Sequence, residues 1–148
     1  MMKRLLMLIL FCSMFTSQAP GGEIDSIDLN AYRWKQRLLF LFVPSADDPS
    51  YLSLKVEIEH QAKEVLDRDL LIAHVLEKGE GRLGMERLSS GQGYSLRKYL
   101  SVPPGRFMSI LVGKDGGVKF RQDRMVGLQD IFRVIDAMPM RRQEMKKK

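Results

Sequence analysis

Leu38 to Val43 form an uninterrupted apolar run between Arg37 and Pro44. A run of this length without polar alternation is typical of a strand that is covered on both faces, as in a sheet between two helical layers. A membrane-spanning helix needs about 20 apolar residues, so the run is too short to cross a bilayer. It therefore predicts the central strand of an α/β domain.

The spacing of apolar residues changes in the next segment. After Asp48, apolar residues recur at steps of three or four, which places them along one face of a helix. Asp48 is suited to cap this helix, and Pro49 to occupy its first position. The apolar positions are Tyr51, Leu54, Ile58, Ala62 and Val65.

Further elements follow the same reasoning. Residues 70–77 predict a second buried strand, and the glycine-bearing residues 78–93 predict a long exposed loop that is suited to recognition. A short helix before Pro103 leads to a third strand over 107–113. Asp115, Gly116 and Gly117 favour a tight hairpin turn into a fourth strand at 118–122. An amphipathic helix over 128–138 ends at Pro139.

The resulting order, β-α-β-α-β-β-α, is that of a thioredoxin-like three-layer α/β/α sandwich with a mixed sheet. Parallel pairs joined by helical crossovers and one antiparallel edge would satisfy the usual connection rules. A three-layer domain with another strand order is the alternative. The residues expected in its core are Phe40, Phe42, Ile72, Ile110, Val112, Phe132 and Ile135.

The chain begins with Lys3 and Arg4, an apolar stretch and then small polar residues, which is the layout of a secretory signal peptide. The expected division is a signal peptide over 1–19, with a cut as late as residue 22 as the alternative, a domain over 30–140, and a basic disordered tail over 141–148. Export to the periplasm or the extracellular space follows from this prediction, and an uncleaved membrane anchor is the weaker alternative.

The charge of +6 is unevenly distributed. Without the start and the tail, residues 20–140 hold 17 bases and 17 acids, so the domain itself is balanced. This excludes a strongly basic surface that would bind a polyanion, and no nucleic acid is expected as a partner. The tail is expected to make at most a weak contact with an anionic membrane surface.

Cys12 is the only cysteine and lies in the expected signal peptide. The loop ADDPS, residues 46–50, stands where thioredoxins carry the segment WCGPC. Asp47 replaces the attacking cysteine and Ser50 the second one, so thiol oxidoreductase and peroxidase chemistry are both excluded in the mature chain. Arg106 lies near the position where thioredoxins place a cis-proline.

Three segments carry a more specific resemblance: RWKQRLLFLFVPSADDPSY, SVPPGRFMSILVGKDGGVKFR and IDAMPMRRQEM. Together they resemble the secreted bacterial family known as domain of unknown function 4174, which covers nearly the whole mature chain. A similar domain occurs in animal extracellular matrix proteins with sushi repeats. The resemblance implies a thioredoxin-like or peroxiredoxin-like fold, and it assigns no catalytic residue.

The candidate functional loop consists of Asp47, Asp48, Ser50 and Arg106. The two adjacent acids are expected to cap a helix, and their alternative role is a shared acid/base or cation site. Glu57, His60 and Glu64 lie on one helical side, but they are expected to form a solvated face rather than a metal site. His74 is assigned no role. No metal, cofactor or catalytic residue is therefore predicted.

Two function classes remain. The first is a non-enzymatic binding or cell-envelope module with an unknown envelope or extracellular protein partner. The alternative is a non-thiol enzyme or cation site that uses Asp47 or Asp48. Tyr32 and Trp34 are expected to cover the sheet edge, and they would mark a partner-binding surface if they were exposed.

Overall fold

The structure is a computed structural model that describes residues 27–147. The expected signal peptide lies outside these residues. A six-stranded mixed sheet runs in the order β4-β3-β2-β1-β5-β6, which confirms the predicted α/β class. Among residues 27–147, no helix combines the length and apolar character needed to span a bilayer.

Strand β1 (Arg37–Ser45) lies in the middle of the sheet. It pairs in parallel with β2 (Leu70–Lys78) and antiparallel with β5 (Met108–Val112). The hairpin partner of β5 is β6 (Val118–Gln122), at the edge of the sheet. Among the described strands only β1 and β2 are parallel, so the expectation of several parallel pairs was wrong.

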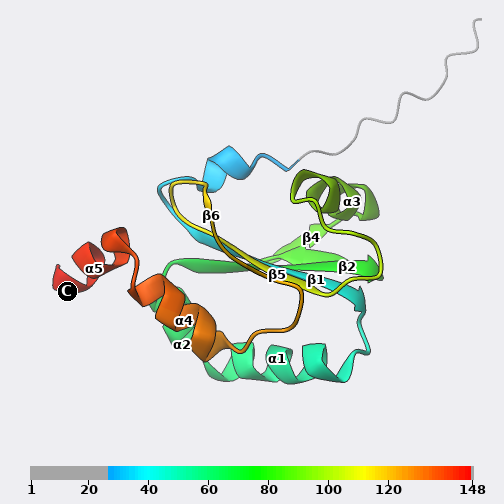
Figure 1. Ribbon diagram of the computed structural model, residues 1–148, viewed down its shortest axis with the longest axis horizontal. Helices are drawn as coiled ribbons and strands as arrows, with labels where there is room; N and C mark the ends of the chain where they lie inside the picture. The colour runs from blue at the N-terminus through cyan, green and yellow to red at the C-terminus, as the bar shows by residue number, and fades with distance from the viewer. Residues whose placement is uncertain (1–26, 148) are drawn as a thin grey trace, which may run out of the picture.

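Helices cover both faces of the sheet (Figure 1). On one face lie α1 (Pro49–His60), α2 (Ala62–Asp67) and α4 (Leu128–Asp136). On the other face lie α3 (Ser90–Tyr99) and the short 3-10 helix η1 (Leu29–Tyr32). Leu39, Leu41 and Val43 of β1 point into the first layer and Leu38, Phe40 and Phe42 into the second. This explains the continuous apolar run.

The predicted core is confirmed, because all seven residues are buried. Ile110, Phe40 and Phe42 are each fully inaccessible to solvent at 0% exposure. Ile110 lies opposite Phe40 in the pairing of β5 with β1. The centre of the core is thus formed by β1 and β5, which match the predicted strands at 38–43 and 107–113.

The stretch expected to be a long loop contains a small hairpin instead. Strands β3 (Gly81–Leu83) and β4 (Glu86–Leu88) extend the sheet beyond β2. Gly81 permits this close approach, because a Cβ there would lie 2.8 Å from the His74 carbonyl oxygen. Ser89 then starts α3 with a capping box that it shares with Gln92.

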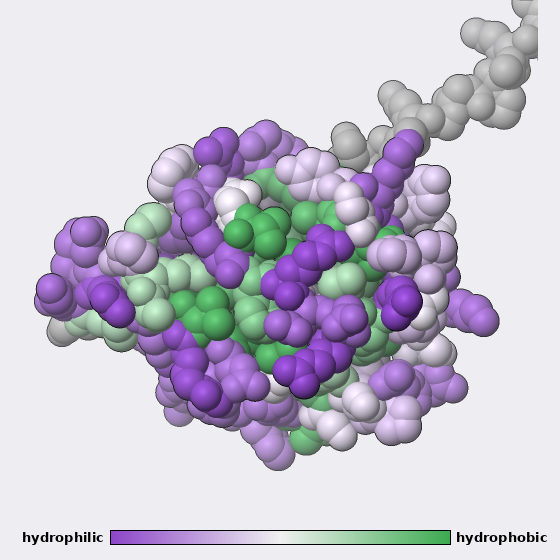
Figure 2. All heavy atoms as spheres, in the orientation of Figure 1, coloured by the Kyte–Doolittle hydropathy of each residue, from purple (hydrophilic) through white to green (hydrophobic). Residues whose placement is uncertain are grey.

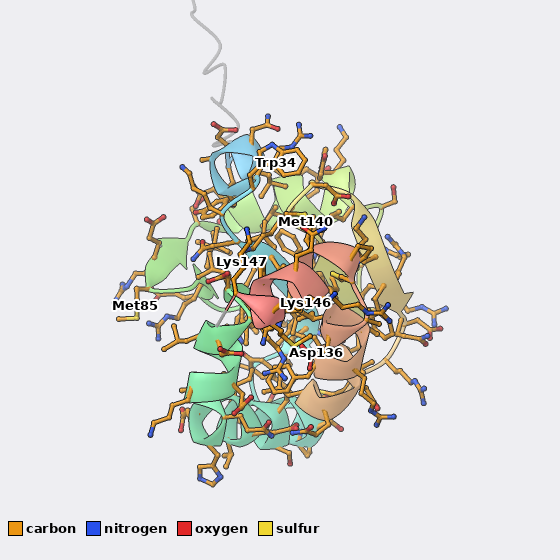
Figure 3. All side chains as sticks on the ribbon, turned by 90° about the vertical axis from the view of Figure 1, so that its left-hand side faces the viewer. Trp34, Met85, Asp136, Met140, Lys146 and Lys147 are labelled. Atoms are coloured by element: carbon orange, nitrogen blue, oxygen red, sulfur yellow. The ribbon has the colours of Figure 1, made fainter. Side chains whose placement is uncertain are left out.

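The expected disordered tail is also corrected, because residues 139–146 form helix α5 (Pro139–Lys146). Arg141 is buried at 3% exposure and pairs with Asp67 and Asp136. Glu144 accepts hydrogen bonds from Arg37 and Lys114. Figure 3 views this end of the molecule, with Asp136 of α4 and Met140 of α5 labelled. Ion pairs to distant residues therefore order a segment that looks like a charged terminus in sequence.

Candidate functional site

The loop after β1 begins helix α1. Asp48 Oδ1 accepts hydrogen bonds from the backbone N–H groups of Ser50, at 2.9 Å, and Tyr51, at 3.0 Å. Pro49 occupies the first helical turn. The predicted capping role of Asp48 is thus confirmed, and the cap uses an oxygen that a cation or a substrate would otherwise need.

Asp47 is exposed and accepts a hydrogen bond from the Ser45 hydroxyl. This hydrogen bond lowers the pKa of Asp47, and the charge of Lys78 adds to the effect. The carboxylate therefore stays ionised at neutral pH and is unsuited to act as a general acid. The side chains of Ser50 and Arg106 are exposed, and neither has a hydrogen bond or an ion pair within residues 27–147. The structure does not join the four residues into one site.

Replacing Asp48 by alanine should lower the free energy of unfolding by about 1 kcal/mol, because two N–H groups of the first turn lose their acceptor. Asp47→Ala is the matched control in the same loop and should have a smaller effect. Denaturant unfolding of both variants measures the difference. Equal losses in the two variants would contradict the assignment of the cap to Asp48 alone.

Near the end of β1 lies a buried arginine that sequence reasoning missed. Arg97 of α3 is 8% exposed, and its Nη2 lies 3.5 Å from the Val43 carbonyl oxygen and 3.7 Å from Glu77 Oε2. Burial lowers the pKa of Arg97, and the charge of Glu77 opposes that shift. Glu77 also accepts a hydrogen bond from the Gly105 N–H at 2.7 Å. The group links α3, the end of β2 and the loop before β5, which is a structural role.

A second feature missed in the sequence is a Tyr–His pair between α1 and β2. Tyr51 is 4% exposed, and its Oη lies 2.9 Å from His74 Nδ1. Burial, followed by the charges of Lys55 and Arg82, lowers the pKa of His74 to about 4. The imidazole is therefore neutral at physiological pH.

The low pKa of His74 predicts that the folded protein loses stability in mild acid. The unfolded chain binds a proton at His74 near the ordinary pKa of 6.5, whereas the folded chain does so only near pH 4. The unfolded state therefore binds more protons between these values. The contribution of the neutral His74 to the free energy of unfolding is complete above pH 6.5. It is lost as the pH falls, by about 2 kcal/mol between pH 7 and 5. Denaturant unfolding at both pH values should show a smaller difference for His74→Gln. An unchanged difference would contradict the assignment to His74.

The acidic residues on the side of α1 and α2 have structural partners. Glu57 Oε1 accepts hydrogen bonds from the Leu128 N–H, at 3.1 Å, and from Gln61 Nε2, at 3.2 Å. Glu57 thus satisfies an N–H group at the start of α4, and Glu64 pairs with Arg68. Among residues 27–147, no group of three histidine, cysteine or acidic residues is arranged to hold a metal ion.

One cavity lies on the other face of the sheet, between η1, the end of α3 and the β5–β6 turn. Its volume is about 610 Å³, and its lining includes Tyr32, Arg33, Tyr99, Asp115 and Val118. Two smaller cavities, of about 240 and 230 Å³, lie beside α5 and α3. None of the three is lined by a residue of the predicted loop site.

Trp34 lies next to the cavity between η1 and the β5–β6 turn and is 63% exposed, so the expectation that it covers the sheet edge was wrong. Tyr32, by contrast, packs against the buried cluster of that face, as expected. Trp34 follows the lining residue Arg33, whose guanidinium lies 5.8 Å from the indole centroid. Figure 3 shows Trp34 beside η1.

Two animal proteins are among the curated relatives that match this chain. Coiled-coil domain-containing protein 80 from Danio rerio is 30% identical over 133 residues, which cover 79% of this chain and 15% of the relative. Sushi repeat-containing protein SRPX from Homo sapiens is 31% identical over 121 residues, which cover 79% of this chain and 26% of the relative. The chain thus spans only a small part of these relatives.

Solved structures of similar fold include peroxiredoxins. The reduced 2-Cys peroxiredoxin of Plasmodium vivax gives a TM-score of 0.58 at 16% identity, covering 78% of this chain and 72% of that one. Thioredoxin peroxidase I of Plasmodium yoelii gives 0.55 at 16% identity, covering 78% and 79%. At this identity the likeness shows the fold alone, and it confirms the predicted thioredoxin-like class.

The family model that matches this chain extends over residues 28–144, from η1 to helix α5. It includes every strand of the sheet and all the side chains described for the candidate site. By this match, the chain belongs to the family described as Domain of unknown function (DUF4174).

Proposed function

We propose that this protein is an exported, thiol-independent binding module that holds a segment of a partner polypeptide on the surface around Trp34. The observation that carries the proposal is the conformation of Trp34, which has a φ of 65° and a largely exposed indole. A bulky residue in the left-handed region costs about 1 to 3 kcal/mol, and such strain concentrates at functional positions.

The backbone around Trp34 maintains this conformation. Its N–H donates a hydrogen bond of 2.7 Å to the Lys114 carbonyl oxygen, next to the β5–β6 turn. The backbone of Trp34 is therefore tied to the Lys114 carbonyl, while its indole stays largely exposed. Exposed tryptophan and tyrosine side chains are the types that supply most of the binding energy at protein interfaces.

The cavity beside Trp34 determines the chemistry of the proposed segment. Leu38, Val112 and Val118 give it apolar walls, while Arg33 and Asp115 carry opposite charges. Figure 2 shows apolar side chains gathered among polar ones on the face that carries β6. A lining of this kind favours an uncharged segment with apolar side chains, in a cavity of the usual size for a binding site.

The length of the relatives supports a modular role. A domain that makes up 15% or 26% of a longer protein is suited to a binding function alongside other parts. The expected partner is an envelope or extracellular protein, in agreement with the expected export. The membrane contact predicted for the basic tail remains a prediction, restricted now to the exposed bases of α5.

Site-specific photocrosslinking in the native envelope tests the surface. Tyr99 and Tyr94 are both exposed on α3, at 72% and 66%, but only Tyr99 lines the cavity. A photoreactive residue at position 99 should give a discrete crosslinked product that Trp34→Ala reduces strongly, whereas position 94 should give none. The same products from both positions, or none from either, would overturn the proposal.

Export has its own test. Mass spectrometry of the envelope protein should find a mature N-terminus between residues 20 and 23, without Cys12. A full-length chain that remains in the cytoplasm would contradict export and would leave the single thiol in the protein. This result would be independent of the crosslinking result.

The alternative of a non-thiol enzyme or cation site at Asp47 and Asp48 gains no support from the geometry. Asp48 is engaged as a helix cap, and Asp47 is an exposed carboxylate held in its ionised form. Loss of the biological effect in both alanine variants, with stability unchanged, would revive this alternative.

A further inference from the structure

Four side chains from three elements meet on the α1 side of the sheet. Tyr51 and Lys55 lie one turn apart on α1, which places them on the same side of that helix. His74 of β2 lies directly opposite Arg82 of β3 in an antiparallel pair. Residues that face each other in this way project from the same side of a sheet. Arg82 therefore comes close to His74 only because β3 folds back along β2.

The hydrogen bond between Tyr51 and His74 orients the imidazole. Burial raises the pKa of Tyr51, so its hydroxyl keeps its proton and is able to donate to His74 Nδ1, 2.9 Å away. With this donor, the ring proton lies on Nε2. Nε2 has no hydrogen-bond partner in the part of the chain that the structure describes, and the ring is partly open to solvent.

The charges around this imidazole are of one sign. Lys55 Nζ lies 5.8 Å from the centroid of the Tyr51 ring. Lys55 and Arg82 are the charged groups whose fields act on His74, and both oppose its protonation. The neighbour of His74 on β1 is the apolar Leu41. Neither Lys55 nor Arg82 forms an ion pair within residues 27–147, whereas the buried Arg37, Lys114 and Arg141 all do.

Two unpaired cations beside a free N–H donor match the needs of a tetrahedral oxyanion that carries one or two negative charges. Such an anion accepts hydrogen bonds in several directions and offsets the repulsion between the two cations. We propose that Lys55, His74 and Arg82 bind the phosphate or sulfate group of a ligand on the α1 side of the sheet. This site is separate from the surface around Trp34, which lies on the opposite side.

The sequence provides a direct probe, because His60 and His74 are its only histidines. Inorganic sulfate should shift the imidazole NMR resonances of His74 saturably and leave those of His60 without a saturable shift. Bound sulfate should also raise the pKa of His74 by about one unit, because the anion favours the protonated ring. Sulfate keeps its charge across this pH range, so the change is assigned to the protein.

Single substitutions at the two cations test the ligand set. Lys55→Gln and Arg82→Gln should each weaken sulfate binding at least tenfold, and each should raise the pKa of His74 without sulfate. Both residues are exposed, so the fold should be kept. The matched controls are Lys98→Gln on α3 and Arg142→Gln on α5, both exposed and without ion pairs in the described residues. These controls should bind sulfate as the parent does.

Two esters distinguish the sources of the anion. Stronger binding of glucose 6-phosphate than of inorganic phosphate would assign the site to phosphoesters, and the same preference for glucose 6-sulfate over sulfate would assign it to sulfated saccharides. A His74 shift that does not saturate, or that persists in both Lys55→Gln and Arg82→Gln, would overturn the proposal. Equal weakening in the controls would do so as well, because it would show a general charge effect.

Discussion

Glu144→Ala should lower the free energy of unfolding by about 3 to 5 kcal/mol, the usual cost of leaving a buried charge, here that of Arg37, without its partner. The Glu144 carboxylate accepts hydrogen bonds from Arg37 Nη2, at 3.2 Å, and from Lys114 Nζ, at 2.7 Å. The side chain of Arg37 is 1% exposed and that of Lys114 9% exposed. Water therefore has little access to these two side chains, so it replaces few of the interactions of the lost carboxylate.

The ionisation of Glu144 agrees with this role. Partial burial tends to raise its pKa, but the hydrogen bond from Lys114 and the charge of Arg37 outweigh burial and lower it. Its stabilisation is thus present above the ordinary pKa of 4.5 and is lost as the pH falls below that value.

Denaturant unfolding of Glu144→Ala and of the control Lys146→Ala measures the effect. Lys146 is exposed in the last turn of α5, so its replacement should change the free energy by less than about 0.5 kcal/mol. Glu144→Gln should fall between the two, since an amide still accepts a hydrogen bond but carries no charge. A loss below about 1 kcal/mol for Glu144→Ala would contradict the role assigned to this ion pair.

Ile110→Ala should lower the free energy of unfolding by about 2 to 5 kcal/mol. Ile110 of β5 is 0% exposed and lies opposite Phe40 of the central strand β1. Both belong to the buried cluster on the face of the sheet that α3 covers. Removing its side chain loses buried apolar area and leaves a cavity that the rigid sheet around it can fill only in part.

The control for Ile110→Ala is Val118→Ala in the neighbouring strand. Val118 is 52% exposed, so its truncation should cost less than about 1 kcal/mol. Equilibrium unfolding of both variants gives the comparison. Similar losses in the two would mean that β5 does not occupy the centre of the core.

The sequence predicted the elements whose signals are local. The apolar run at 38–43, the Asp48 cap and the turn at 115–117 each follow from a few adjacent residues, and all three are present. Strands β3 and β4 contain only three residues each, which is too few for a periodic pattern. Their pairing depends on the close approach that Gly81 permits, and this is visible only in three dimensions.

The functional groups were harder to predict because they are assembled from distant positions. Asp47, Asp48, Ser50 and Arg106 were chosen for their place relative to a thioredoxin motif, and the structure gives them no common geometry. Tyr51 and His74 are 23 positions apart, and Arg82, which lies opposite His74, comes from the unforeseen hairpin. Trp34 was expected to pack against the domain. Its left-handed backbone conformation could not be predicted, because the residue type alone does not indicate it.

The contact between Arg37 and Glu144 joins positions that are 107 residues apart. During synthesis, β1 emerges early with an arginine that must be buried, and its carboxylate partner follows only when translation has passed residue 144. A nascent chain that already contains the whole sheet still lacks the negative charge that balances Arg37. The domain therefore reaches its full stability only late in synthesis. A chain that stops before α5 contains a buried Arg37 without its carboxylate partner and is less stable than the complete domain.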